Sequence, residues 1–263
     1  QPFIKTYMYV KDDDFHTLRL IPDGCKTLIF YRNQHPAEYC TKESNNKTKR
    51  ENFYSCLAGP RINYTDLNTI DKHLESIIVE FQVSGLRAFF NMPMHELCNM
   101  FITPQILGEQ DFAELEEQIL SVNDVRNCFT ILDKFFINRI RRSNADILNF
   151  KRIDNSIKEM TTKAMASTAC LSERQYLRVF EEYNGLTPKN YLRLIRLNTT
   201  LADLRAIALA NNKENMSITE IAYKNGYYDL SHLNIDCVQI TGYSPTTIME
   251  QYKREKRPES FML

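Results

Sequence analysis

The chain has few residue patterns that could carry out catalysis. The histidines of the first half stand alone, at His16, His35, His73 and His95, without the close spacing that lets imidazoles converge on one metal ion. No Ser/His/Asp or Cys/His set is legible, and the seven glycines form no phosphate-binding loop. We therefore expect no catalytic residue, no metal and no cofactor. A ligand-binding or metal-dependent barrel enzyme is kept as an alternative, which an empty metal assay would count against.

The seven cysteines are odd in number, widely spaced and never arranged as CxxC. This pattern is typical of reduced, mostly buried thiols and predicts a cytoplasmic protein. Cys25, which follows Pro-Asp-Gly, is the thiol that could act as a sensor, the alternative being a small buried side chain beside a turn. The chain begins with Gln1 rather than Met, so the natural protein can extend further at this end.

Composition sets the limits for the fold. With 263 residues and 43% hydrophobic residues, the chain is long and apolar enough for one large or two modest domains with buried cores. Its 33 basic and 33 acidic residues cancel, so no overall field favours nucleic acid or membrane. The last 113 or so residues are nevertheless slightly basic and the first part slightly acidic. No apolar run approaches the roughly 18 residues that a membrane span needs, so no membrane partner is expected.

The first part of the chain has the alternation of β-strands and then changes to a helical period. Strands are predicted at residues 3–10, 17–21, 27–31 and 77–81, with an exposed hairpin tip at 42–50. A short amphipathic helix is predicted from Asp111 to Ile119 and a longer one from Asn123 to Arg142. The apolar stripe of the longer helix either packs on its own domain or pairs with a second copy, so the protein is expected to be a monomer or a homodimer.

The last hundred residues contain an internal duplication. Each copy reads as a short helix with a central Ala (Ala166, Ala222), a tight turn, and a second helix ended by Gly (Gly185, Gly242). Thr187-Pro188 and Ser244-Pro245 then supply a hydroxyl N-cap and a Pro at the first position of the next helix. Ser217 and Glu220 have the spacing of a capping box. The duplication predicts two helix-turn-helix units.

On these residues the chain resembles the AraC/XylS family of bacterial transcription regulators. The resemblance covers about residues 147–252 and rests on Leu171–Phe180, Gly185–Tyr191 with Arg196-Leu197, and Ile218–Tyr227 leading to Ser231-His232. A looser similarity to a sensor domain found on some such regulators rests on Leu20–Phe30, Leu57–Pro60, Val79–Phe81 and Phe89–Leu97.

The resemblance implies an α+β protein. We expect an antiparallel, β-rich, barrel-like sensor at 1–108, a helical linker with a possible dimer contact at 109–146, and an all-α DNA-binding domain at 147–263. A linker helix at about 188–210 would hold the two recognition helices near one turn of DNA apart. The implied partners are double-stranded DNA, a small-molecule effector and RNA polymerase.

The family also implies roles for residues of the first unit. Arg174, Leu177 and Arg178 would face the bases, since Arg can bond a guanine edge bidentately and Leu can touch a thymine methyl group. Gln175, Lys189 and Asn190 would contact phosphates. Ser172 would be the N-cap, with Tyr176 and Phe180 toward the core. The alternative for Arg174 and Arg178 is a solvated face that pairs with Glu173, Glu181 or Glu182.

The second unit departs from the family pattern. Its base-facing positions would be Leu230, Ser231, Asn234 and Ile235, so the usual Arg is absent. Cys237 replaces the usual buried Phe, and Cys170 replaces the turn Gly of the first unit. We expect Asp229 and Asp236 to repel phosphates and the unit to contribute little affinity. An interaction module that has lost its DNA-reading surface is therefore a second alternative.

Overall fold

The computed structural model describes residues 3–33, 35–42, 48–70, 72–90, 92–104, 110–142, 147–209, 216–254 and 261–262. The strands are β1 (Ile4–Asp12), β2 (Leu18–Leu20), β3 (Thr27–Tyr31), β4 (Ala37–Lys42), β5 (Thr48–Phe53), β6 (Ser55–Ala58), β7 (Thr65–Asn68), β8 (Leu74–Phe81), β9 (Phe101–Ile102) and β10 (Phe261–Met262). The 3-10 helices are η1 (Gly85–Ala88) and η2 (Met94–Leu97). The α-helices are α1 (Gln110–Ser121), α2 (Val125–Arg142), α3 (Ile147–Ser156), α4 (Thr162–Thr168), α5 (Glu173–Asn184), α6 (Pro188–Leu209), α7 (Ile218–Lys224), α8 (Leu230–Thr241) and α9 (Pro245–Arg254).

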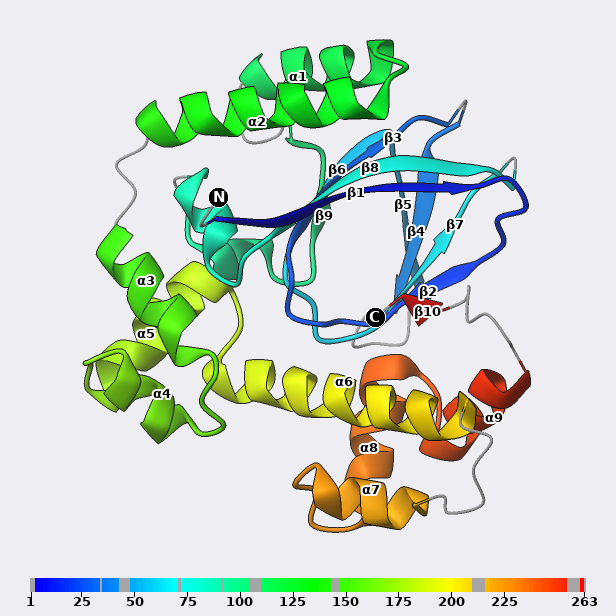
Figure 1. Cartoon of the computed structure of the whole chain (residues 1–263), viewed down its shortest axis with the longest axis vertical. Helices are drawn as coiled ribbons and strands as arrows, with labels where there is room; N and C mark the ends of the chain where they lie inside the picture. Colours follow the sequence, from blue (N-terminus) through cyan, green and yellow to red (C-terminus); the bar gives the residue numbers. More distant parts are fainter. Residues whose placement is uncertain are drawn as a thin grey trace.

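The first part of the chain forms two five-stranded sheets that face each other (Figure 1). One sheet has the order β1-β8-β3-β6-β9 and is antiparallel throughout. The other has the order β10-β2-β7-β4-β5, in which the C-terminal strand β10 pairs with β2 in parallel. The expected α+β class with a β-rich, barrel-like first domain is thus confirmed, with a strand from the other end of the chain added to it.

Strand β3 explains how the two layers are held together. Its side chains alternate: Leu28 and Phe30 point to the outer side of the sheet, Ile29 and Tyr31 to the space between the sheets. Because both faces of β3 are covered, its sequence is apolar without a break, as in a strand buried on both sides. The inner cluster also holds Tyr39 of the opposite sheet.

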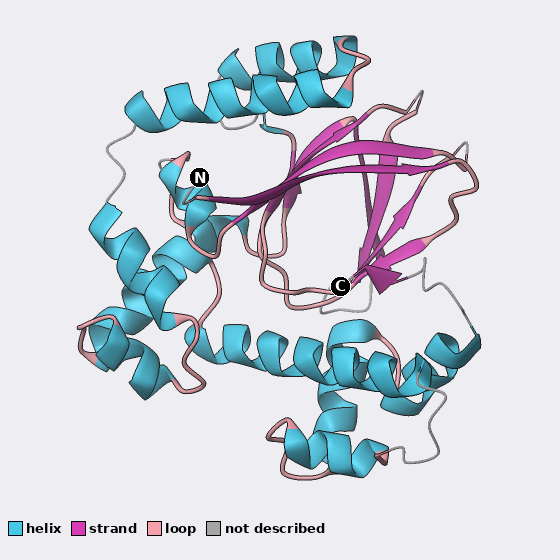
Figure 2. Cartoon of the chain, in the orientation of Figure 1, coloured by secondary structure: helices cyan, strands magenta, loops and turns pink. Residues whose placement is uncertain are grey.

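Helices α1 and α2 cover the outer face of the first sheet (Figure 2). Leu132 and Phe136 of α2 are completely buried against it, and each such side chain stabilises the fold by roughly 1.5–3 kcal/mol relative to exposure. The apolar stripe of α2 therefore packs on its own chain, one of the two predicted alternatives. A dimer contact by another face of this helix stays a prediction.

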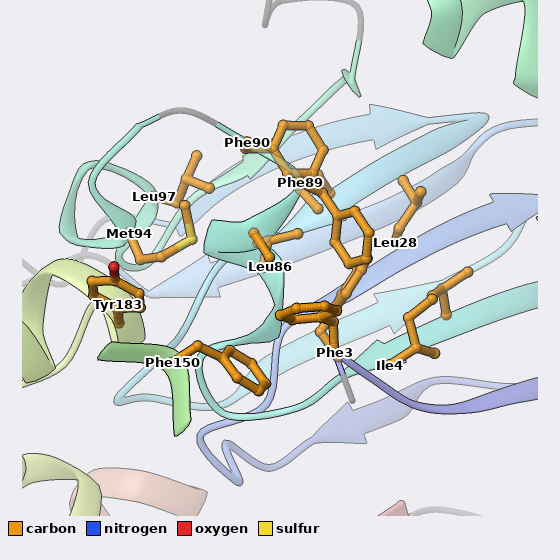
Figure 3. Packing of buried hydrophobic residues seen from close by; sticks show 14 of the residues in the cluster. Phe3, Ile4, Leu28, Leu86, Phe89, Phe90, Met94, Leu97, Phe150 and Tyr183 are labelled. Carbon is orange, nitrogen blue, oxygen red and sulfur yellow. The ribbon is translucent and has the colours of Figure 1, made fainter. Parts of the chain in front are cut away.

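The core does not stop at the predicted boundary between residues 146 and 147. One hydrophobic cluster contains residues of the first sheet, η1, η2, α1 to α5 and the start of α6 (Figure 3). Phe3, just before β1, lies 4.4 Å from Phe150 of α3 between ring centres. A second cluster joins α6 to α7, α8 and α9. The first helical unit thus shares a core with the sensor, and the second shares one with α6 and with Ile21 of the sensor. The domain limits themselves stay a prediction.

The strands expected at 3–10, 17–21, 27–31 and 77–81 are present with small shifts at their ends. Strands β4 to β7, β9 and β10 were not predicted. β4, β5 and β7 are rich in polar residues, and β6, β9 and β10 are too short, at four, two and two residues, to show an alternation. Of the predicted tip at 42–50, residues 43–47 lie outside the described part, and residues 48–50 belong to β5 rather than to a loop.

Candidate nucleic-acid interface

The first helix-turn-helix unit is built by local signals. Thr161 caps α4 by accepting a hydrogen bond from the amide of Ala164 (3.2 Å). Ser172 and Gln175 form a capping box at the start of α5, and Gly185 ends the helix in the left-handed conformation (φ +89°). Cys170, in the turn, has φ +55°, a conformation that favours glycine. The predicted caps at Ser172 and Gly185 are confirmed.

Helix α5 has a buried side and an exposed side. Tyr176 and Phe180 are fully buried, as predicted, and the Tyr176 hydroxyl lies 2.7 Å from Ser156 Oγ. Burial raises the pKa of Tyr176 to about 12, so the hydroxyl remains protonated. The exposed side carries the predicted readers Arg174, Gln175, Leu177 and Arg178.

The two arginines of this exposed side are not engaged within the chain. Neither Arg174 nor Arg178 has an ion pair or hydrogen bond to any described residue. Of the three glutamates that could have paired with them, Glu182 instead bonds Arg87, 3.5 Å away. Their guanidinium groups are therefore available to an external acceptor. Gln175 is less free, because its Oε1 accepts hydrogen bonds from the Ser172 amide and hydroxyl (3.1 and 2.8 Å).

Helix α6 begins four residues after the end of α5. Thr187 accepts a hydrogen bond from the Asn190 amide (3.2 Å), which fixes the first turn behind Pro188. Lys189 is exposed there and Asn190 is half-buried. At 1.5 Å per residue, the 22 residues of α6 span about 33 Å, close to one turn of B-DNA. The helix has the length that two adjacent major grooves require.

The second unit repeats the first. Ser217 and Glu220 form the predicted capping box of α7, and Gly242 ends α8 with φ +80°. Asp229 caps α8 by accepting a hydrogen bond from the His232 amide (2.7 Å), and the His232 ring packs on Tyr227. Leu230, Ser231 and Asn234 are exposed, as expected of base-facing positions. The large apolar or aromatic side chains exposed in this unit are Tyr223, Tyr228, Leu230, Ile235 and Val238.

The expectation that Asp236 repels phosphates is wrong. Its side chain is only 4% exposed and bonds Arg193 Nε at 2.7 Å and Arg196 Nη2 at 3.3 Å. Both arginines belong to α6, so the carboxylate is neutralised and ties α8 to the linker helix. The outer face of α8 therefore carries a mixture of apolar side chains and uncharged polar side chains rather than acidic ones. Cys237 fills the buried position of the missing Phe, and burial raises the pKa of its thiol to about 12.

In the sensor, Asp23, Cys25 and Glu80 bring possible ligand atoms within 4.8 Å of one another. The Lys5 ammonium already occupies this group, 2.7 Å from Glu80 and 3.9 Å from Cys25 Sγ. Burial raises the pKa of Cys25, so the thiol stays protonated and is a poor nucleophile. This chemistry favours the buried-thiol alternative over a thiol sensor.

Sequence reasoning missed the contacts between the two halves of the molecule. The Asn198 amide of α6 donates to the carbonyl of Pro22 (2.9 Å), and Gly24 lies against the ring of Tyr191. Arg19 of β2 bonds Asp66 through two nitrogens and reaches the carbonyl of Thr241, the last residue of α8 (3.3 Å). No local signal in the sequence reports such contacts, because the partners are far apart along the chain.

Two family models match the chain, on either side of the linker. Residues 165–251 match the family described as "Helix-turn-helix domain", and residues 1–103 match "Domain of unknown function (DUF6597)". The XylDLEGF operon transcriptional activator of Pseudomonas putida is 30% identical over 112 residues, 41% of this chain and 34% of the relative. Residues 165–251 are thus a helix-turn-helix domain similar to that of AraC/XylS-type activators.

The HTH-type transcriptional activator RhaS of Salmonella newport is a further relative, 31% identical to this chain over 97 residues, which is 37% of the chain and 32% of RhaS. The chain spans about a third of the length of the curated relatives it matches. Among solved structures, ToxT from Vibrio cholerae is similar at 12% identity, with 93% of this chain and 97% of ToxT covered and a TM-score of 0.44. None of the described helices is long and apolar enough to cross a membrane.

Proposed function

We propose that this AraC-type chain is a sequence-specific DNA-binding transcription regulator that responds, through its N-terminal domain, to a small molecule or a partner. The observation that carries the proposal is the exposed side of α5, where Arg174 and Arg178 have no partner in the described chain. A guanidinium with open donors on a helix of this type suits the edge of a guanine.

In this proposal Arg174, Leu177 and Arg178 read bases in the major groove. Phosphates are contacted by Lys189, by Asn190 and by the side-chain amide nitrogen of Gln175. These contacts set the register, since phosphate contacts position a protein without reading sequence. In the second unit Leu230, Ser231 and Asn234 would contact the DNA. Leu230 can touch a thymine methyl group and Asn234 can bond an adenine edge.

The domain limits and partners are part of the same proposal. The sensor spans 1–108, the linker 109–146 and the DNA-binding domain 147–263, with RNA polymerase as a further partner of a monomer or homodimer. As a DNA-binding regulator, the protein would act in the cytoplasm and would not be an enzyme. Pro22 and Gly24 of the sensor contact α6, the helix that joins the two helix-turn-helix units. These contacts support a sensor that acts directly on α6.

The test is fluorescence anisotropy with the duplex upstream of the protein's own gene and a scrambled duplex of the same composition, each at several salt concentrations. We expect tighter binding to the native duplex, and an affinity that falls steeply with salt as counterions are released. Equal, weak binding to both duplexes at low salt would refute sequence-specific recognition.

One observation favours a second candidate, an interaction module that does not read DNA. The second unit exposes Tyr228 (83%), Tyr223 (58%) and Ile235 (53%), and such side chains are typical of protein contacts. In that case Tyr228→Ala would leave DNA affinity unchanged and abolish capture of a protein partner. Loss of DNA affinity in the same variant would instead include Tyr228 in the DNA interface.

A further inference from the structure

Strand β1 lies at the margin of the first sheet and has a hydrogen-bonded neighbour on one side only. The order β1-β8-β3-β6-β9 places β8 on its inner side, and none of the described strands pairs with its other side (Figure 1). β1 has nine residues, whereas β9, at the opposite margin, has two. The first sheet therefore has one long open edge, and such an edge is a template for pairing with a further strand.

The register of the neighbouring strand β8 shows which backbone groups of β1 are open. In an antiparallel sheet, the N–H and C=O groups of successive residues point alternately to one neighbouring strand and to the other. On the β3 side, the Phe81 amide donates to the carbonyl of Lys26 (3.1 Å). The Arg32 amide likewise donates to the carbonyl of Glu75 (2.8 Å). The odd-numbered residues of β8 thus point toward β3, and its even-numbered residues point toward β1.

The same alternation assigns the backbone groups of β1. The residues opposite the even-numbered positions of β8 are Thr6, Met8, Val10 and Asp12. The N–H and C=O groups of Tyr7, Tyr9 and Lys11 consequently point away from β8, toward the open edge. The Tyr7 carbonyl accepts a hydrogen bond from the hydroxyl of Thr6 (3.2 Å), and a carbonyl oxygen has a second lone pair for another donor.

The middle of this edge has few of the features that protect an edge strand from pairing. Residues 6–10 include no charged residue and no proline, and they are mostly β-branched or aromatic types that favour strands. The irregularity in the register with β8 lies before Thr6. The charges lie near the two ends of the strand, with Lys5 at its start and an acidic stretch, residues 12–14, at its end.

We propose that the open edge of β1 pairs with the same edge of a second copy of this chain, antiparallel and with Tyr9 on the two-fold axis. In this register Tyr9 lies opposite Tyr9 of the partner, and Tyr7 lies opposite Lys11. Each outward-pointing N–H and C=O group of these three residues then has a partner. Because the same surface is used on both copies, the contact closes after two chains.

The charges at the two ends of β1 select this orientation and this register. In the antiparallel pair, Lys5 of each copy faces the acidic stretch of the other, and opposite charges across a strand pair are favourable. A parallel pair would bring the two acidic stretches together. An antiparallel pair centred on Met8 would place Lys5 opposite Lys11, which is unfavourable.

The two ends are accessible for this contact. Half of the Lys5 side chain (52%) and most of the Asp13 side chain (73%) are exposed. Lys5 already bonds Glu80 (2.7 Å), and Asp13 bonds His73 (2.9 Å). The contact between copies therefore adds attraction between ends of opposite charge without leaving an unpaired charge in either single chain.

This contact goes beyond the proposed function, which leaves the choice between monomer and homodimer open. It rests on the proposed function only for the regulatory meaning of a dimer. None of the proposed DNA-contacting residues lies on β1, so both copies keep α5 and α8 exposed.

The first experiment is analytical ultracentrifugation of the full chain without DNA over a range of concentrations. We expect a monomer–dimer equilibrium. Tyr9→Pro removes an N–H that points to the open edge, a position that proline tolerates in an edge strand. It should stay folded and dimerise at least about tenfold more weakly, because two donors are lost per dimer. Tyr9→Phe is the matched control and should dimerise normally. Met8→Pro removes an N–H that points to β8 and should destabilise the fold itself.

The second experiment needs no variant, so it decides the matter even where Tyr9→Pro does not fold. Amide hydrogen exchange is measured residue by residue in dilute and in concentrated protein. The amides of Tyr7, Tyr9 and Lys11 should exchange rapidly when dilute and slowly when concentrated, while those of Met8 and Val10 should exchange slowly in both.

Three results would overturn the proposal. They are a monomer at every concentration, a dimer that a folded Tyr9→Pro protein forms equally well, and exchange at Tyr7, Tyr9 and Lys11 that does not change with concentration. The second result would assign the dimer to another surface. Since no DNA is present, each of them leaves the proposed DNA-binding function untouched.

Discussion

At the scale of single residues, Arg178 and Ser231 are both exposed on the second helix of their unit, but only Arg178 has several open donors. We expect Arg178→Ala to weaken specific binding by about 1–3 kcal/mol in anisotropy titrations. Ser231→Ala should change it by less than about 0.5 kcal/mol. Both residues are exposed, so stability should be unaffected in both variants. Equal losses of affinity would contradict the unequal use of the two units.

A second residue-scale prediction concerns the turn of the first unit. Cys170 is exposed and has φ +55°, so Cys170→Gly removes backbone strain without losing packing. Because glycine also gains entropy in the unfolded chain, we expect a net gain of up to about 1 kcal/mol in urea unfolding. Gly226, in the second turn, is the matched control. A Cβ at position 226 would have no atom within 4 Å, so an alanine there fits without a clash. Because φ is +78°, which alanine rarely adopts, we expect Gly226→Ala to lower the free energy of unfolding by about 1 kcal/mol. A lower midpoint for Cys170→Gly would show that the turn is not strained.

At the scale of elements, the orientation of α8 depends on a buried charge cluster rather than on its own sequence. Asp236→Ala removes the carboxylate that pairs with both Arg193 and Arg196, so the two positive charges lose their shared counter-charge. We expect the free energy of unfolding to fall by about 3–5 kcal/mol, measured by urea unfolding. Glu173→Ala, on the exposed start of α5, is the control and should change it by less than about 0.5 kcal/mol. A stable Asp236→Ala protein would mean that packing alone fixes α8.

At the scale of the whole molecule, Arg19 joins the sensor to the second unit. Its guanidinium lies between the rings of Tyr64 (3.9 Å) and Tyr243 (4.4 Å) and bonds the carbonyl of Thr241, at the negative end of α8. We expect Arg19→Ala to accelerate amide hydrogen exchange in the last turn of α8 and leave α5 unchanged. Tyr243→Ala removes the stacking while keeping the Arg19–Asp66 pair, and should have the same effect. Unchanged exchange in both variants would mean that this contact does not hold the two halves together.

Local signals in the sequence were enough to predict the two helix-turn-helix units. Caps at Ser172, Ser217, Gly185 and Gly242 bond atoms within about four residues, so their residue types report the structure directly. The burial of Tyr176 and the exposure of Arg178 follow from the same helical period. The strands of the sensor were predicted only in part, because the missed strands are either rich in polar residues or too short to show an alternation.

Only the tertiary structure decided which charges and backbone groups remain available to a partner. Asp236 could not be known to be neutralised, since its arginines lie about 40 residues earlier on another helix. The backbone groups of Tyr7, Tyr9 and Lys11 could not be known to stay open, since this depends on which strands lie beside β1. Local hydrogen bonding fixes helices and their ends, whereas burial and charge compensation arise from contacts between distant segments. The sequence alone therefore determined the two helix-turn-helix units and the exposed sides of their helices, and the packing of the whole chain determined the inner face of the sensor and its connection to those units.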